Sequence, residues 1–239
     1  MSAREHGTGS RIRAGTQPKD STAPAHGASV TAVLDPATRG LVRVALGLLD
    51  GSEARLAGWM AEALRAGTPA LWLEEMLISS VLYIGFPRAL VAMAEFRRLA
   101  PVPAPGAEAA DYERWPEWRS RGEEACRVVY GSHYEQLRHN VRALHPALEQ
   151  WMIVDGYGKT LSRPGLDLTR RELCSVAMLI PQMAPRQLLA HLRGALNAGA
   201  PPAQIDEVLA LAGESGVVPA GLGVARNLWR ELQDTLGHD

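Results

Sequence analysis

The sequence predicts an all-α protein, and three observations support that prediction. Hydrophobic residues make up 46% of the chain but aromatic residues only 5%, a composition that favours tightly packed helices over sheet. Apolar residues recur at helical spacing between residues that begin or end helices. Finally, the segment that starts at Leu34 aligns without a gap on the segment that starts at Leu166, which is the pattern of a duplicated helical unit.

The first repeat, residues 30–100, contains four predicted helices. The first begins at Asp35-Pro36, an N-cap followed by a proline at the first helical position. Its apolar stripe consists of Leu41, Val44, Ala45 and Leu48. The second helix ends at Gly67 and the third begins at Pro69. The break Gly85-Phe86-Pro87 separates the third helix from a fourth, which runs to about Leu99.

The rest of the chain divides into a tail, a linker and a second domain. Residues 1–29 are polar, lack the apolar stretch of a secretory signal and are predicted to be a disordered tail. Residues 101–120 are rich in Pro and Ala, lack periodicity and are predicted to be a linker. The predicted helices of the domain 121–239 lie near 121–130, 133–144, 146–156, 169–180, 185–198, 202–213 and 219–236, with a loop over 156–168.

Composition narrows the classes of function. The net charge of −1 gives no general attraction to nucleic acid or to an anionic membrane, and no apolar run approaches the length of a membrane span. Cys126 and Cys174 are too few for a disulfide framework, so we expect buried, reduced thiols in a cytoplasmic protein. The chain has no tetrahedral or facial-triad ligand set and no phosphate-binding glycine loop, so we expect no metal and no cofactor.

An acid and a base distinguish the second repeat from the first. Glu172 and His191 align with Gly40 and Trp59 of the first copy. Both side chains lie at the edges of apolar stripes on consecutive helices of a predicted antiparallel hairpin, so they can meet. An imidazole beside a buried carboxylate suits proton transfer near neutral pH, although such a pair can also be a structural hydrogen bond in a core. Loss of both partners in the first copy favours chemistry in the second.

Two stretches of the second domain resemble a known family. YGKTLSRPGLDLTRREL and QLLAHLRGALNAGAPPAQIDEVL resemble the carboxymuconolactone decarboxylase family, which includes alkylhydroperoxidase D-like proteins. The resemblance runs from about Arg121 to Trp229, and EEMLISSVLYIGFPRAL looks like part of a diverged second copy. It implies an all-helical fold assembled from packed hairpins, often as trimers or hexamers. We therefore expect two duplicated units packed as a pseudo-dimer, and a homo-oligomer, with a trimer favoured.

The resemblance also bears on the reaction. The peroxidase branch of the family uses a C-x-x-C pair, and the matching positions here are Ala184 and Gln187, so thiol-dependent peroxide reduction is not expected. The remaining likeness is to the decarboxylase branch. It implies a cofactor-independent lyase acting on a carboxylated lactone or cyclic keto-acid. His191 would deliver a proton to carbon, and Glu172 would hold the tautomer of the imidazole.

Substrate-binding candidates follow from the same motifs. Arginines can hold a carboxylate with two hydrogen bonds, and a tyrosine and an amide can line a pocket; the candidates are Arg163, Arg171, Arg138, Tyr130 and Gln187. Each arginine could equally be a surface or helix-capping residue, and the tyrosine a turn anchor. Two other readings stay open. The chain could be an isomerase, hydrolase or cyclase that uses the same Glu/His pair on another small molecule, or a non-catalytic small-molecule-binding or assembly protein.

Overall fold

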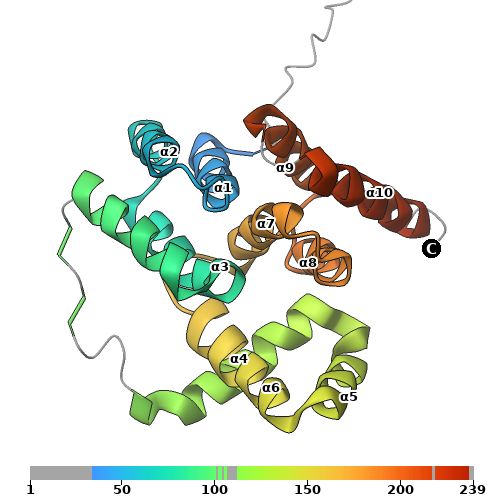
Figure 1. Ribbon diagram of the computed structural model, residues 1–239. Coiled ribbons are helices and arrows are strands. Elements are labelled where there is room, and N and C mark those ends of the chain that lie inside the picture. The colour runs from blue at the N-terminus through green and yellow to red at the C-terminus, as the bar shows by residue number, and fades with distance from the viewer. Residues whose placement is uncertain (1–33, 101, 104, 107–111, 217–218, 237–239) are drawn as a thin grey trace, which may run out of the picture. The chain divides into compact units, whose positions relative to one another are not determined.

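Every regular element in the part of the chain that the structure describes is helical, which confirms the all-α prediction (Figure 1). The computed structural model describes residues 34–100, 102–103, 105–106, 112–216 and 219–236. The tail predicted over residues 1–29 lies outside the described residues.

The two repeats have matching helix boundaries. The first repeat contains α1 (Pro36–Gly47), α2 (Glu53–Arg65) and α3 (Ala70–Leu99). The second contains α7 (Leu168–Leu179), α8 (Pro185–Asn197), α9 (Pro202–Ser215) and α10 (Pro219–Leu236). The ends of α1 and α2 coincide with those of α7 and α8 at the offset of the sequence repeat. Helices of the two repeats pack directly on one another, α1 against α7 and α9, and α3 against α7.

The same N-cap begins both repeats. The carboxylate of Asp35 accepts a hydrogen bond from the backbone N–H of Thr38 at 2.9 Å, and that of Asp167 accepts one from Arg170 at 3.0 Å. Each bond satisfies one of the amide groups that the first turn of a helix leaves unpaired. Arg170 also donates to Thr38, its counterpart in the first repeat, so equivalent positions meet where α1 and α7 pack.

Helix α3 joins two of the predicted helices across a kink. Gly85, with φ 70° and ψ 168°, is non-helical, and Pro87 follows it. By length and composition α3 is apolar enough to cross a membrane, although no apolar run of that length was expected. The same length and composition occur in core helices, and the kink divides α3 into segments shorter than the roughly 20 residues that a spanning helix needs. Leu73, Met76, Leu77 and Phe96 lie in the core.

Two ion pairs cross between the repeats in a reciprocal way. Arg171 of α7 binds Glu75 of α3, with 2.9 Å between Nη2 and Oε2 and both side chains buried. At the equivalent positions Arg39 of α1 binds Glu207 of α9, through Nε and Oε1 at 2.6 Å. Such an exchange is the contact pattern of a two-fold interface. The expected pseudo-dimer would have such contacts and stays a prediction, and the described residues belong to one compact unit.

The segment between the repeats is more helical than expected. Its α-helices are α4 (Trp115–Tyr130), α5 (Tyr134–Leu144) and α6 (Pro146–Trp151). Helix α4 begins inside the segment predicted as a linker. A π-helix, η4 (Met152–Leu161), replaces the first part of the loop expected over 156–168. A β-carbon on Gly158 would lie 1.8 Å from the carbonyl oxygen of Trp118, so only glycine allows η4 to approach α4 this closely.

The reciprocal ion pairs differ in burial, which predicts different contributions to stability. Glu75→Gln leaves the Arg171 guanidinium, 0% exposed, without its countercharge. We expect the free energy of unfolding to fall by about 3 kcal/mol. The matched variant Glu207→Gln acts on Arg39, whose side chain is 38% exposed and can be hydrated, so we expect a loss of about 1 kcal/mol. Urea unfolding measures both values, and equal losses would contradict the assignment of Arg171 as the buried anchor.

Candidate functional site

His191 and Glu172 meet in the core, where α7 and α8 pack. The Nδ1 atom of His191 lies 2.8 Å from Oε2 of Glu172. Glu172 is fully buried, whereas the imidazole keeps a small exposed area and lines a pocket. With Glu172 ionised, Nδ1 donates to the carboxylate and Nε2 is left with the lone pair. The geometry therefore gives His191 a fixed tautomer, in which the nitrogen not bound to Glu172 can accept a proton.

A glycine on α8 makes room for the buried carboxylate. A β-carbon on Gly194 would lie 2.6 Å from Oε2 of Glu172 and 2.7 Å from Cγ1 of Val129. The other carboxylate oxygen, Oε1, has no hydrogen-bond partner among the described residues. A buried acceptor without a partner is costly for folding. Such a cost points to a functional rather than a structural reason for keeping the acid.

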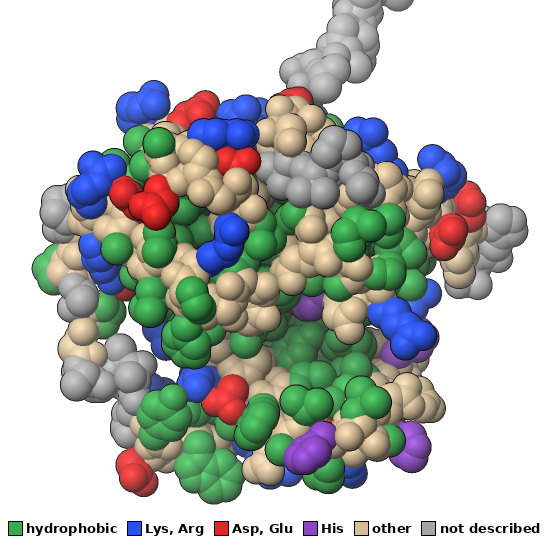
Figure 2. Space-filling model, in the orientation of Figure 1, with side chains coloured by type: hydrophobic (Ala, Val, Ile, Leu, Met, Phe, Trp, Pro, Cys, Tyr) green, Lys and Arg blue, Asp and Glu red, His purple; other side chains and the backbone are tan. Residues whose placement is uncertain are grey.

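The pocket beside His191 has a volume of about 520 Å³. Figure 2 shows a hollow with hydrophobic side chains inside it and a histidine at its edge. The lining combines aromatic and aliphatic side chains with a few polar groups, and consists of Leu82, Tyr83, Tyr130, Leu148, Trp151, Met152, Asp155, Gly156, Tyr157, Leu161, Leu179, Gln182, Ala184, Gln187 and His191. A concave, mostly apolar pocket with few polar groups is the usual form of a small-molecule site.

Tyr83 brings the first repeat into the site. Its ring packs edge-on against the His191 imidazole, with 5.7 Å between the centroids. Its hydroxyl lies 2.6 Å from Oγ of Ser175, and Ser175 donates its own proton to the carbonyl of Arg171, so Tyr83 is the donor to Ser175. Burial raises the pKa of Tyr83 well above its usual value, and the nearby Glu172 carboxylate adds to the shift. The phenol therefore stays neutral and positions the imidazole ring.

Tyr130 and Tyr157 also line the pocket. Their rings meet edge-on with 6.3 Å between the centroids. Burial raises the pKa of Tyr130 to about 12, against the effect of a side-chain hydrogen bond with Tyr157, and burial also raises the pKa of Tyr157 well above its usual value. Two neutral phenols that share one hydrogen bond have one hydroxyl proton in that bond and one that is free. That proton can be donated to a ligand.

The structure separates the predicted substrate-binding residues into two groups. Tyr130 and Gln187 line the pocket with His191. Ala184 also lines it, and Ala184 and Gln187 are the positions that match the redox cysteines of the peroxidase branch. The three arginines do not line it. Arg171 and Arg163 both bind Glu75 where the repeats meet, and Arg138 binds Glu149 at 2.6 Å. Their guanidinium groups are already paired with glutamates, and a role in holding the substrate stays a prediction.

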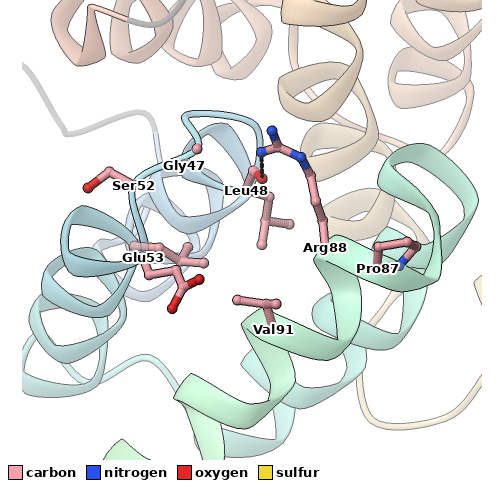
Figure 3. Close-up of a pocket in the computed structure, with 9 residues that line it drawn as sticks. Gly47, Leu48, Ser52, Glu53, Pro87, Arg88 and Val91 are labelled. Atoms are coloured by element: carbon pink, nitrogen blue, oxygen red, sulfur yellow. Dashed lines mark hydrogen bonds between the residues drawn. The ribbon is translucent and has the colours of Figure 1, made fainter.

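The first repeat carries a pocket of a different character. It has a volume of about 300 Å³ and is lined by residues of α1, α2 and α3 together with the loop after α1. Figure 3 shows Arg88 in this pocket, donating to the carbonyl of Leu48. The counterpart of Glu172 is Gly40, and the counterpart of His191 is Trp59, whose indole packs against Gly47 so closely that a β-carbon there would overlap it. This half has no counterpart of the acid–base pair.

Comparison with known proteins agrees with the geometry. Residues 146–231 match the sequence model of the carboxymuconolactone decarboxylase family. A relative from Schizosaccharomyces pombe, named Peroxisomal protein 2, is 30% identical over 156 residues, which span 63% of this chain and 72% of the relative. The chain belongs to the carboxymuconolactone decarboxylase family. The family match includes both Glu172 and His191 and begins after the first repeat.

The role of Gly194 in making room for the Glu172 carboxylate can be tested. We expect Gly194→Ala to push the Glu172 carboxylate away from His191, because the new methyl group would overlap Oε2. The signal of the hydrogen-bonded Nδ1 proton of His191 should then disappear from the NMR spectrum. The free energy of unfolding should fall by about 1–3 kcal/mol. Gly58→Ala is the control, since a β-carbon there contacts nothing within 4 Å. An unchanged imidazole spectrum in Gly194→Ala would show that the carboxylate does not need this space.

The cysteines lie away from the pocket lining, and their chemistry gives a separate prediction. Burial raises the pKa of Cys126 and of Cys174 to about 12. At pH 8 the thiolate fraction of each is then about 10⁻⁴, far below that of an exposed cysteine. We expect no reaction with a disulfide reagent in the folded protein and two equivalents of thiol after denaturation. Rapid reaction of either cysteine in the folded state would contradict this.

Proposed function

We propose that this chain is a cofactor-independent enzyme in which His191 moves a proton to or from a carbon atom of a small molecule. The observation that carries the proposal is the His191–Glu172 pair, with its acid fully buried and its base on the wall of a pocket. A buried carboxylate fixes the tautomer of the imidazole and balances the charge of its protonated form, as in other acid–base pairs. The enzymes of the family support a catalytic role.

Decarboxylation of a carboxylated lactone or cyclic keto-acid is the leading candidate reaction. Loss of CO₂ leaves an electron pair that must be delocalised as an enolate and then protonated at carbon. His191 in its protonated form would supply that proton, and the free hydroxyl proton of the Tyr130–Tyr157 pair would donate a hydrogen bond to the enolate oxygen. The apolar lining excludes water, which strengthens both interactions.

Two other candidates use the same pocket. An isomerase, hydrolase or cyclase would employ His191 and Glu172 on a substrate that keeps its carboxyl group. A non-catalytic binding or assembly protein would use the pocket without proton transfer. The proposal also includes a small-molecule ligand, a homo-oligomer with a trimer favoured, a cytoplasmic location and no nucleic-acid or membrane partner. The name of the relative from Schizosaccharomyces pombe refers to the peroxisome.

The proposal is tested by proton exchange and CO₂ release in D₂O. A panel of carboxylated lactones and cyclic keto-acids is incubated with the protein, and NMR follows both CO₂ loss and deuteration at carbon. We expect Glu172→Gln and His191→Gln each to lower the rate by about 10²–10⁴-fold. Because the two residues act as a unit, the double variant should lose little more than either single one.

The control for these variants is His139→Gln, which alters an exposed histidine outside the pocket. Thermal unfolding confirms that each variant is folded. Turnover within a few-fold of the unaltered protein in both folded site variants would rule out the proton-transfer role. Exchange at carbon without CO₂ loss would favour the isomerase alternative over the decarboxylase.

A further inference from the structure

A second pocket lies against the helix that carries His191. It has a volume of about 210 Å³ and is enclosed by α4, α5 and α8. Its polar lining is basic or neutral, and consists of Tyr130, His133, Gln136, Asn140, Arg186 and Arg193. No carboxylate is among the residues that line it.

The two arginines of this pocket lack partners. Among the described residues, neither Arg186 nor Arg193 makes a hydrogen bond or ion pair, and both side chains are exposed. Arg138, Arg163 and Arg171 are by contrast all bound to glutamates. An unpaired arginine presents a planar set of donors that matches a carboxylate or phosphate, so this pocket attracts oxyanions.

The pocket beside His191 has no cation in its lining. Its one acid, Asp155, is paired with Lys159 at 2.6 Å, and no arginine or lysine lines it. Its apolar walls cannot compensate the charge of an anionic group, which would be desolvated there at a high cost. An anionic substrate therefore needs a cation from outside this pocket.

One ring and one helix connect the two pockets. Tyr130 lines both of them. On α8, Arg186, Ala190 and Arg193 are on the side of the basic pocket, while Gln187 and His191 are on the side of the acid–base pocket. The two pockets therefore lie on adjoining faces of α8, with the Tyr130 ring between them.

We propose that Arg186 and Arg193 bind an oxyanion of the substrate, a carboxylate or a phosphate, while the reacting part of the substrate occupies the pocket of His191. This inference rests on the proposed function, because it identifies what the acid–base pair acts upon. The substrate is then a small amphipathic anion with an apolar, ring-sized body. In a decarboxylation this oxyanion is not the carboxylate that leaves as CO₂: it is a second charged group, which is retained and held on the far side of Tyr130.

The test uses benzoate, phenyl phosphate and benzamide as probes, with NMR signals of the His133 and His191 imidazoles as the readout. We expect benzoate or phenyl phosphate to shift both imidazoles, and the tighter of the two to identify the oxyanion. Arg186→Gln and Arg193→Gln should each lower the affinity for that anion by about tenfold or more. The affinity for uncharged benzamide should stay the same, and added salt should weaken the binding of the two anions only.

Arg65→Gln, an exposed arginine on α2 without a partner among the described residues, is the matched control and should leave all three affinities unchanged. Anion affinity that is unaltered in both Arg186→Gln and Arg193→Gln overturns the inference. So does an anion that shifts His133 but not His191, because the basic pocket would then be a separate site. His191→Gln separates this inference from the proposed function, since it should abolish turnover while keeping benzoate affinity within a few-fold.

Discussion

The buried ion pair between Arg171 and Glu75 holds α7 against the first repeat, and the acid–base site depends on that placement. Arg171 and Glu172 are neighbours on α7 but point in different directions, one into the first repeat and the other toward α8. Arg171 also donates to the carbonyls of Leu166 and Arg163, so it ties down the chain that leads into the helix. A carboxylate can be kept in a core only if its helix is held this firmly, because any displacement would separate it from His191.

The first repeat is therefore part of the site although it contains no acid–base pair. It supplies Glu75, which fixes α7, and Tyr83, whose ring packs against the imidazole. Both come from α3, and the kink at Gly85 lies two residues after Tyr83. One half thus carries the acid–base pair, and the other half positions it.

The sequence predicted the helices and the central pair well, because both depend on local patterns. Caps at Asp35 and Asp167 and the apolar stripes are readable within one turn or two, and the hairpin spacing brings Glu172 and His191 together. The pairing of Arg163 and Arg171 with Glu75 could not be predicted, because Glu75 lies far away in the chain. Tyr83 was missed for the same reason. The π-helical form of η4 has no simple periodicity, although the paired glycines Gly122 and Gly158 could have indicated a close approach of two helices.

The exchange of residues between the repeats has a consequence for how such a duplication can change. Where the second repeat has Glu172 and Gly194, the first has Gly40 and Glu62, with Glu62 turned outward to Arg43. Gly40 leaves no room for a side chain, since a β-carbon would lie 2.6 Å from Thr68. Restoring a carboxylate at position 40 alone would thus create a clash and an unpaired buried charge, and a histidine at position 59 alone would have no partner. Neither substitution alone would create an acid–base pair, so several residues of the first repeat would have to change together.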